Sequence, residues 1–391
     1  MARCCEVSGE AAVTDRPRAL DVATGVGAAY TSRLLAEVGW DVVKAEPPEG
    51  DPLRQAEARW GGGRGGAFLF ANAGKRGVTV DGSTLVRLAA AADVVVGDFS
   101  PSGRAAMGLP DDAYEVLAPR RAVASVSAFG LTGPKAAWAS TDLIVQAASG
   151  LMFLTGEFDQ PPMQLPPYQG AMTGGVAAAS ATLLAVRSSR GDGTLHRVDT
   201  SMVEALAVHT AAQLSDYVYR GAVARREARV KGGLRMVPAS DRFVYCAPGA
   251  VSSMRMEGIA ILLDEPRLAE GRFQTAEGRM EHFDDFVALF VPPFKRRTAQ
   301  EWFEDAEAMH MTFALVQTIE DLLHCPQIEA RELLRTTEAP DGSLVRMPGR
   351  PYRIVDGPAA ATRPAPASPG IHTAEVLAEW LGANEGARTH A

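Results

Sequence analysis

The sequence predicts an α/β protein with a parallel sheet in a large domain and a smaller α+β domain. First, short apolar runs alternate with helical stretches from residue 18 to about residue 130, a rhythm typical of a parallel sheet with helices on both faces. Second, a charge-rich stretch at residues 220–231 marks a boundary. Third, the residues beyond it mix strand and helix patterns without that rhythm, as an α+β domain does.

The first β-α-β unit lies near the start of the chain. Residues 18–22 form an apolar run that predicts a strand, and a loop of small residues follows it. Apolar residues then recur at helical spacing up to Val38, and Gly39 stands where a helix C-cap is expected. A second strand over residues 41–44 completes the unit.

Further elements of the large domain follow the same rhythm. Residues 92–97 and 122–126 predict buried strands, each preceded by a helical segment. The Ala- and Gly-rich stretch at residues 174–186 predicts a tightly packed helix. Another strand over residues 196–202 leads into a helix over residues 203–219.

We predict four segments in the domain organisation. Residues 1–17 are a flexible lead-in, and residues 18–220 are the N-terminal part of the large domain. Residues 221–335 form the small domain with its linkers, and residues 336–391 return to the large domain and end in a helix. Within the small domain we predict one strand and two helices, over residues 242–246, 283–290 and 299–306.

Composition and charge limit the classes of function. The chain has 391 residues and a net charge of −8, which argues against a nucleic-acid-binding surface because such a surface needs a basic stripe. Its four cysteines show no metal-ligand or disulfide spacing, so no metal site is predicted. No apolar run is long enough to span a bilayer, and the N-terminus lacks the features of a signal peptide. We expect a soluble cytoplasmic protein that binds neither nucleic acid nor membrane.

Several motifs occur along nearly the whole chain. A Glu-Pro-Pro-x-Gly-Asp-Pro-x-Arg pattern begins at Glu46, and further motifs lie at residues 72–81, 127–134, 142–152, 154–157, 364–366 and 372–377. Together they resemble the class III CoA-transferase family, which includes formyl-CoA transferases, carnitine CoA-transferases and α-methylacyl-CoA racemases. The resemblance implies a Rossmann-like large domain, with its parallel sheet built from both chain ends, and an interlocked homodimer. It implies CoA or an acyl-CoA as a small-molecule substrate and no tightly bound cofactor.

The family's covalent chemistry requires an aspartate that this sequence lacks. In the family's transferases, an aspartate before an Ala/Gly-rich helix attacks the acyl-CoA carbonyl and forms a mixed anhydride. Alignment on Gly175 places that aspartate at Ala171, and a shift of one or two residues offers Gly170 or Gln169. The racemases' aspartate also falls on Ala171, and their histidine falls on Thr141. We therefore predict that neither the anhydride route nor two-base racemisation operates here.

The residues that the resemblance implies for CoA binding are only partly kept. Lys75 matches the family pattern, whereas Asp98 stands in a segment that carries Asn and a basic residue in the family. A further basic residue of the family is Ala106 here, with Arg104 as a candidate substitute. An aspartate that faces a phosphate is unfavourable, so CoA binding is expected to be weakened. We predict CoA or substrate contacts at Val26, Lys75, Asp98, Arg104 and Thr141.

Two residues beside the vacated position are candidates for a catalytic role. Tyr168 and Gln169 can each hydrogen-bond a carbonyl oxygen, and the alternative is that they only line the pocket. Asp142 and Asp199 match residues common in the family, for which we favour a structural role.

Three hypotheses follow. The first is an enzyme of bacterial specialised metabolism that acts on an acyl thioester or a carboxylic small molecule by isomerisation, elimination or cyclisation, through positioning and polarisation. The second is a working acyl-CoA:carboxylate CoA-transferase whose catalytic carboxylate is displaced. The third is a non-catalytic dimeric binding subunit. The first hypothesis fits the clustered changes best.

Overall fold

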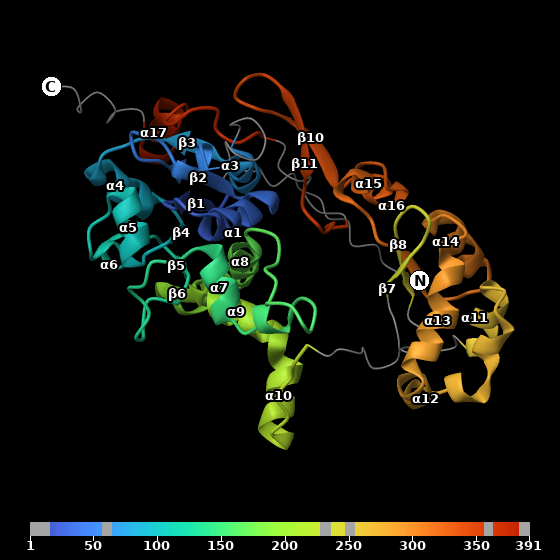
Figure 1. Ribbon diagram of the computed structural model, residues 1–391. Helices are drawn as coiled ribbons and strands as arrows, with labels where there is room; N and C mark the ends of the chain where they lie inside the picture. Colours follow the sequence, from blue (N-terminus) through green and yellow to red (C-terminus); the bar gives the residue numbers. More distant parts are fainter. Residues whose placement is uncertain (1–15, 57–64, 227–235, 247–254, 356–362, 383–391) are drawn as a thin grey trace, which may run out of the picture. The chain divides into compact units, whose positions relative to one another are not determined.

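The computed structural model describes residues 16–56, 65–226, 236–246, 255–355 and 363–382 (Figure 1). These residues belong to two compact units. As far as they are described, the first comprises Met1–Thr155, Pro162–Ala224 and Glu332–Ala391, and the second comprises Gly156–Pro161 and Arg225–Arg331. The flexible lead-in predicted for residues 1–17 lies almost entirely outside the described residues.

A six-stranded parallel sheet forms the centre of the first unit, in the order β3-β2-β1-β4-β5-β6. Its strands are β1 (Arg18–Asp21), β2 (Asp41–Ala45), β3 (Arg76–Val78), β4 (Val94–Gly97), β5 (Ala122–Ser127) and β6 (His196–Ser201). Every adjacent pair is parallel. The five strands that the sequence predicts in the large domain are confirmed, with ends that shift by one or two residues.

Ten α-helices of the first unit are described, with two short 3-10 helices between them and a third beside α9. They are α1 (Val26–Glu37), η1 (Pro52–Arg54), α3 (Gly66–Asn72), α4 (Gly82–Ala91), α5 (Pro101–Met107), α6 (Ala113–Val116), α7 (Asp142–Ala148), η2 (Met152–Leu154), α8 (Gln169–Asp192), α9 (Met202–Ala207), η3 (Val208–Thr210), α10 (Ala211–Arg220) and α17 (Thr373–Leu381).

Helices cover both faces of the sheet, as the sequence predicts. On one face, Leu20 of β1 and Val95 of β4 pack with α4 and α17. On the other face, Ala19 and Val94 pack with α1 and α8. Neighbouring residues of one strand thus face opposite layers, which is the two-residue period of a β-strand.

The prediction that both chain ends build the sheet is wrong for its strands, because the described strands of this sheet all lie between residues 18 and 201. The unit contains both ends, but the C-terminal segment adds helix α17 and an antiparallel hairpin of β10 (Leu334–Glu338) and β11 (Leu344–Pro348). This segment meets edge strand β3 at Gly77, whose N–H donates to Nδ1 of His372 and whose carbonyl accepts from the N–H of His372. Because the side chain of His372 takes the place of a backbone acceptor, this contact does not extend the hydrogen-bond ladder of the sheet beyond β3.

Helix α8 is longer than the stretch 174–186 that the sequence predicts. It begins after Tyr168, whose φ is +69°, and ends at Gly193, whose φ is +73°. By length and composition alone, this one described helix is apolar enough to cross a membrane. It packs against α1 and the sheet, as the core helix of a globular unit does. The predicted helix over residues 203–219 is divided into α9, η3 and α10.

The second unit is α+β, as predicted. Its antiparallel sheet has the order β7-β8-β9, with strands at Met236–Pro238, Phe243–Cys246 and Phe313–Leu315. Its helices are α11 (Met256–Leu262), η4 (Pro266–Ala269), η5 (Gly271–Phe273), α12 (Ala276–Glu281), α13 (Phe283–Phe294), α14 (Ala299–Ala308), α15 (Ile319–Leu323) and α16 (Pro326–Ala330). The predicted strand and both predicted helices are confirmed.

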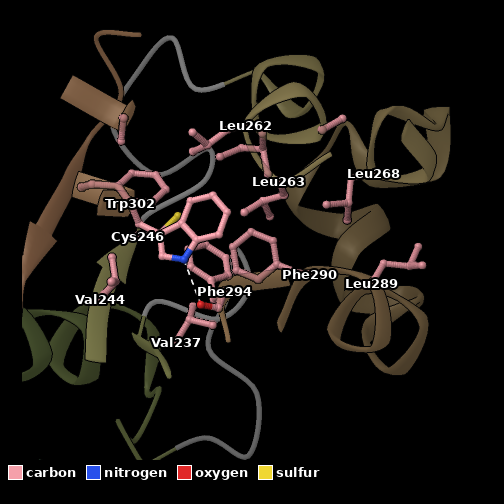
Figure 2. Packing of buried hydrophobic residues seen from close by; sticks show 14 of the residues in the cluster. Val237, Val244, Cys246, Leu262, Leu263, Leu268, Leu289, Phe290, Phe294 and Trp302 are labelled. Carbon is pink, nitrogen blue, oxygen red and sulfur yellow. Dashed lines mark hydrogen bonds between the residues drawn. The ribbon is translucent and has the colours of Figure 1, made fainter. Parts of the chain in front are cut away.

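An aromatic core holds the second unit together (Figure 2). Phe286, Phe290 and Phe294 follow one another along α13, and each ring contacts the next. Trp302 of α14 packs on Phe294 and donates its indole N–H to the carbonyl of Phe294 at 2.8 Å. Because the ring is buried and its polar atom is paired, this residue contributes apolar area without an unsatisfied donor.

Candidate functional site

A cavity of about 250 Å³ lies at the carboxyl edge of the parallel sheet. Residues at the carboxyl ends of three strands line it: Gly25–Gly27 after β1, Asp98, Ser100 and Ser102 after β4, and Ser127–Phe129 at the end of β5. Strand order reverses between β1 and β4, and ligands of open α/β sheets bind at such a switch point, outside the carboxyl ends of the strands. The topology therefore makes this cavity the candidate site.

The first turns of two long helices complete the cavity wall. Val26 opens α1, and Ala171 lies in the first turn of α8. The two helices approach closely at Gly175 of α8, since a Cβ added there would lie 2.8 Å from the carbonyl oxygen of Gly27 of α1. Helix N-termini carry partial positive charge and unpaired N–H groups. The two helix starts therefore add partial positive charge to the cavity wall, and at Ala171 the carboxylate of Asp142 offsets part of it by accepting the backbone N–H.

Tyr168 stands immediately before α8 with a left-handed backbone and lines the same cavity. A non-glycine residue in this region costs about 1–3 kcal/mol, and such residues gather at functional sites. The observed conformation brings Tyr168 to the cavity next to Ala171, whose side chain is 7% exposed.

Asp142 has the structural role that the sequence favours. Its Oδ1 accepts the backbone N–H of Ala171 at 3.1 Å, and its Oδ2 accepts Nε2 of Gln146 at 2.7 Å. Oδ1 thus holds α7 against the start of α8, whereas Oδ2 is engaged within α7. Asp199 is also structural, because its Oδ2 accepts the N–H of Leu131 at 2.9 Å.

Asp98 is the other carboxylate of the cavity. Its Oδ1 accepts the N–H of Ser100 at 2.9 Å. Burial raises the pKa of Asp98, and the hydrogen bonds from Ser100 and the charge of Arg104 only partly oppose this shift. The carboxyl group lies against Gly103, where an added Cβ would come within 2.4 Å of its Cγ. The first turn of α5 thus fixes the position of the Asp98 side chain.

Five of the predicted site residues line this one cavity, namely Val26, Asp98, Thr141, Tyr168 and Ala171. Gln169 is the first residue of α8 and is not part of the lining. Arg104 lies on α5, where its Nη1 donates to the carbonyl of Phe99 at 2.6 Å and its Nη2 to Asp111 at 3.0 Å. The first contact holds the turn between β4 and α5, and the second joins α5 to the segment before α6.

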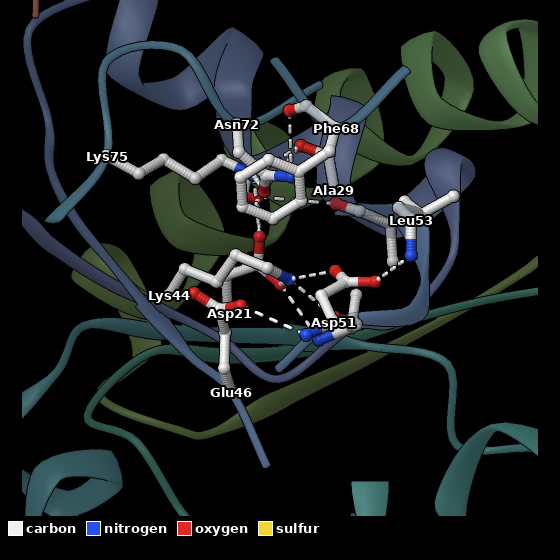
Figure 3. Close-up of polar contacts among 12 residues, drawn as sticks. Asp21, Ala29, Lys44, Glu46, Asp51, Leu53, Phe68, Asn72 and Lys75 are labelled. Atoms are coloured by element: carbon white, nitrogen blue, oxygen red, sulfur yellow. Dashed lines mark hydrogen bonds and ion pairs between the residues drawn. The ribbon is translucent and has the colours of Figure 1, made fainter. Parts of the chain in front are cut away.

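Lys75 corrects our prediction of a CoA contact, because the structure places it in the core (Figure 3). Its Nζ donates to Asp21 at 2.6 Å, to the carbonyl of Ala29 at 2.7 Å and to Asn72 at 2.8 Å. An ammonium group has three donors, and all three are used. Burial lowers the pKa of Lys75 to about 8, although the charge of Asp21 opposes this shift.

Ser127 is a cavity residue that our sequence analysis did not select. It is the last residue of β5 and is 1% exposed, and its hydroxyl has no hydrogen-bond partner among the described residues. A signal was present, since a polar residue at the carboxyl end of a buried parallel strand is placed at the edge where ligands bind. The strand predicted from the sequence ends at residue 126, one residue before Ser127.

The lining has a distinct chemical character. It combines hydroxyl groups with the carboxylates of Asp98 and Asp142, and none of its described residues is Lys, Arg or His. Lys135 contacts two lining residues from outside this set, with Nζ 5.8 Å from the ring centre of Phe129 and 5.1 Å from that of Trp138. Within the described ranges, no group of His, Cys, Asp and Glu is arranged to hold a metal ion.

A larger cavity of about 820 Å³ lies beside α5 in the same unit. Ala106, which replaces a basic residue implied for CoA binding, is part of its lining. Glu46, Glu49 and Asp51 also line it, and the described lining contains no Lys, Arg or His. Glu46 is paired with Arg54 and Asp51 with Lys44, so the described lining offers no further cation to a phosphate group.

Known proteins share the sequence and the fold of this chain. The model of CoA-transferase family III matches residues 17–373. Succinate–glutarate CoA-transferase from Agrobacterium fabrum is 29% identical over 382 residues, which cover 93% of this chain and 94% of the relative. Subunit BbsE of succinyl-CoA:(R)-benzylsuccinate CoA-transferase from Thauera aromatica is 30% identical over 393 residues and 93% of each chain. The crystal structure of a CaiB/BaiF family protein from Brucella suis superposes with a TM-score of 0.82 and 25% identity, covering 94% of this chain and 98% of that one.

Proposed function

Because this chain belongs to CoA-transferase family III, we propose that it is an enzyme that acts on an acyl thioester or a carboxylic small molecule without forming an aspartyl anhydride. The match agrees with the resemblance that the sequence motifs showed. The observation that supports the proposal is that Ala171 lines the cavity, because alignment of the sequence on Gly175 assigns the family's nucleophile to this residue. Its methyl group can neither attack a carbonyl nor carry an acyl group.

The remaining groups of the cavity support positioning and polarisation instead. The first turns of α1 and α8 supply partial positive charge, and the hydroxyl-bearing residues Ser127 and Thr141 line the cavity beside them. Such groups stabilise an enolate or oxyanion without covalent capture of the substrate. Isomerisation, elimination and cyclisation of a bound acyl compound all pass through species of this kind.

Asp98 supports a second candidate function, an acyl-CoA:carboxylate CoA-transfer with a displaced catalytic carboxylate. Asp98 lines the same cavity as Ala171 and directly follows strand β4. Several relatives are named for transfer between dicarboxylates, among them succinate–glutarate CoA-transferase. Against this role, burial favours the protonated form of Asp98, which is a weaker nucleophile.

We also propose a soluble, cytoplasmic homodimer. Helix α10 and the turn before it expose several large apolar side chains, namely Val208, Leu214, Tyr217, Val218 and Tyr219, and such a patch is typical of a protein interface. Light scattering of the purified protein tests this, with a mass of two chains expected. The Thauera relative is named as a subunit, and a chain that remains monomeric alone would contradict the homodimer and indicate assembly with a different chain.

The test restores the missing carboxylate. We expect wild-type protein incubated with succinyl-CoA to form no acyl-enzyme that hydroxylamine cleaves, and Ala171→Asp to form one and to transfer CoA to glutarate. The helix N-terminus at this position favours an ionised carboxylate by about 0.3–1 kcal/mol. Intact-protein mass spectrometry detects the adduct, and Ala171→Asn is the control of matched size that lacks a nucleophile.

Each result of this test separates the candidates. A hydroxylamine-sensitive adduct on the wild-type protein would contradict our proposal and favour the displaced carboxylate, and its loss in Asp98→Asn would locate it. If Ala171→Asp also fails to react with succinyl-CoA, the scaffold no longer holds acyl-CoA productively. The substrate is then a carbonyl compound without CoA.

A further inference from the structure

We propose that this cavity recognises an uncharged carbonyl group, as in a thioester, ester or amide, and that the hydroxyl of Ser127 donates a hydrogen bond to the carbonyl oxygen. The inference rests on the proposed function and narrows its substrate class. A free carboxylate should bind more weakly than a neutral carbonyl at the position next to Ser127.

The first argument is the unused hydroxyl. Ser125 and Ser127 lie two residues apart on β5 and therefore face the same side of the sheet. The hydroxyl of Ser125 accepts the backbone N–H of Phe99 at 3.4 Å. The hydroxyl of Ser127 has no partner among the described residues, although the side chain is 1% exposed. Native proteins pair nearly all buried polar groups, so a bound ligand is the expected partner.

The second argument is the place of this hydroxyl. Ser189 on α8 is also buried without a hydroxyl partner, but it is not among the residues that line the cavity. Ser127 lines the cavity at the switch point of the sheet, together with Tyr168 and Ala171. A ligand in this cavity is therefore the partner that we assign to the hydroxyl.

The third argument is charge. Asp98 and Asp142 line the cavity, and no described residue of the lining is a cation. A carboxylate placed here would meet the charge of Asp142, and would make ionisation of the buried Asp98 still less favourable, with no cation in the described lining to offset either effect. A neutral carbonyl needs only a hydrogen-bond donor, which a serine hydroxyl provides. The negative charge of the cavity wall and the unpaired hydroxyl donor of Ser127 thus both favour a neutral carbonyl group.

The experiment compares three ligands by calorimetric titration of the full chain. They are the N-acetylcysteamine thioester of butyrate, butyrate itself and butyryl-CoA. We expect saturable binding of the neutral thioester, binding of butyrate at least tenfold weaker, and no advantage from the CoA moiety. Ser127→Ala should weaken binding of the thioester about tenfold, which is what loss of one hydrogen bond gives.

Ser189→Ala is the matched control, because it also removes an unpartnered buried hydroxyl. It should leave thioester binding unchanged. Thermal unfolding without ligand is the second readout, and both variants should be at least as stable as the wild-type protein, since neither loses a hydrogen bond.

Four results would overturn the inference. They are absence of thioester binding by the wild-type protein, butyrate binding as tight as thioester binding, equal affinities in Ser127→Ala and Ser189→Ala, and a melting temperature of Ser127→Ala several degrees below that of Ser189→Ala. The hydroxylamine test described above decides the proposed function separately, because it reports on covalent chemistry and not on this hydrogen bond.

Discussion

Two polar regions lie at the same edge of the parallel sheet and differ in how completely their groups are paired. In the cluster around Asp21, which is the last residue of β1, the ammonium groups of Lys44 and Lys75 make short contacts to carboxylates and carbonyls (Figure 3). In the adjacent cavity, the Ser127 hydroxyl has no partner among the described residues and the Asp98 carboxyl is desolvated. The paired region is organised for stability, and the unpaired region retains capacity for a ligand.

The pKa values of Asp21 and Asp98 show the same difference between the two regions. Burial alone raises the pKa of Asp21, but the charges of Lys44 and Lys75 outweigh it and hold the pKa below its usual value. Asp98 lacks such neighbours, so burial prevails and its pKa is raised. A carboxylate of the first kind stabilises the fold when ionised, whereas one of the second kind destabilises it.

The largest effect should come from breaking the paired region. Asp21→Ala leaves Lys44 and Lys75 buried without their shared carboxylate, and such a loss costs about 3–5 kcal/mol of unfolding free energy. Denaturant unfolding measures it. Glu332→Gln, which removes an exposed ion pair with Arg353 in the same unit, is the control and should show no measurable change. A loss below about 1 kcal/mol in Asp21→Ala would mean that the cluster is not organised for stability.

A smaller effect should follow from crowding the unpaired region. A Cβ at Gly103 would lie 2.3 Å from the backbone oxygen of Asp98, which cannot rotate away. We expect Gly103→Ala to destabilise the protein by about 1–3 kcal/mol and to displace the Asp98 carboxyl from the cavity wall. Gly82→Ala is the matched control in the first turn of α4, where an added Cβ meets no heavy atom within 4 Å. It should be neutral or slightly stabilising, so equal losses in both variants would contradict the close contact.

The smallest effect should be a gain in stability from Asp98→Asn. Because the folded-state pKa of Asp98 lies above the unfolded value of 3.8, its stabilising contribution is present below pH 3.8 and is lost as the pH rises through the folded pKa. The amide keeps an acceptor for Ser100 and has no charge to desolvate. At pH 7 the variant should be more stable by on the order of 0.5–1 kcal/mol. Unfolding curves from pH 3 to pH 8 test this, and a gain that does not depend on pH would contradict it.

Much of the fold could be predicted, because local periodicity reports burial. The apolar runs at residues 92–97 and 122–126 became β4 and β5, and the loop after residue 22 became the first segment of the cavity wall. The motifs also placed Ala171 at the helix start that lines the cavity. These features depend on neighbours in the sequence, so the sequence contains the information.

Partners distant in the sequence could not be predicted. Lys75 matched a motif and was predicted to contact CoA, but its distance in sequence from Asp21, 54 residues, hides the ion pair that occupies it. Ser125 and Ser127 carry the same hydroxyl group on the same strand. The backbone N–H of Phe99 reaches the hydroxyl of Ser125, whereas the hydroxyl of Ser127 has no partner among the described residues.

By itself, the sequence determined the α/β class, the family of the chain and the alignment of Ala171 with the family's aspartate. Periodicity and motif order are local properties of the chain, so they can be recognised without the structure. The tertiary structure alone decided that Lys75 serves the core, that five predicted residues meet at one cavity, and that Ser127 keeps a free donor there. These are properties of three-dimensional packing, since a buried polar group is defined by which distant atoms reach it.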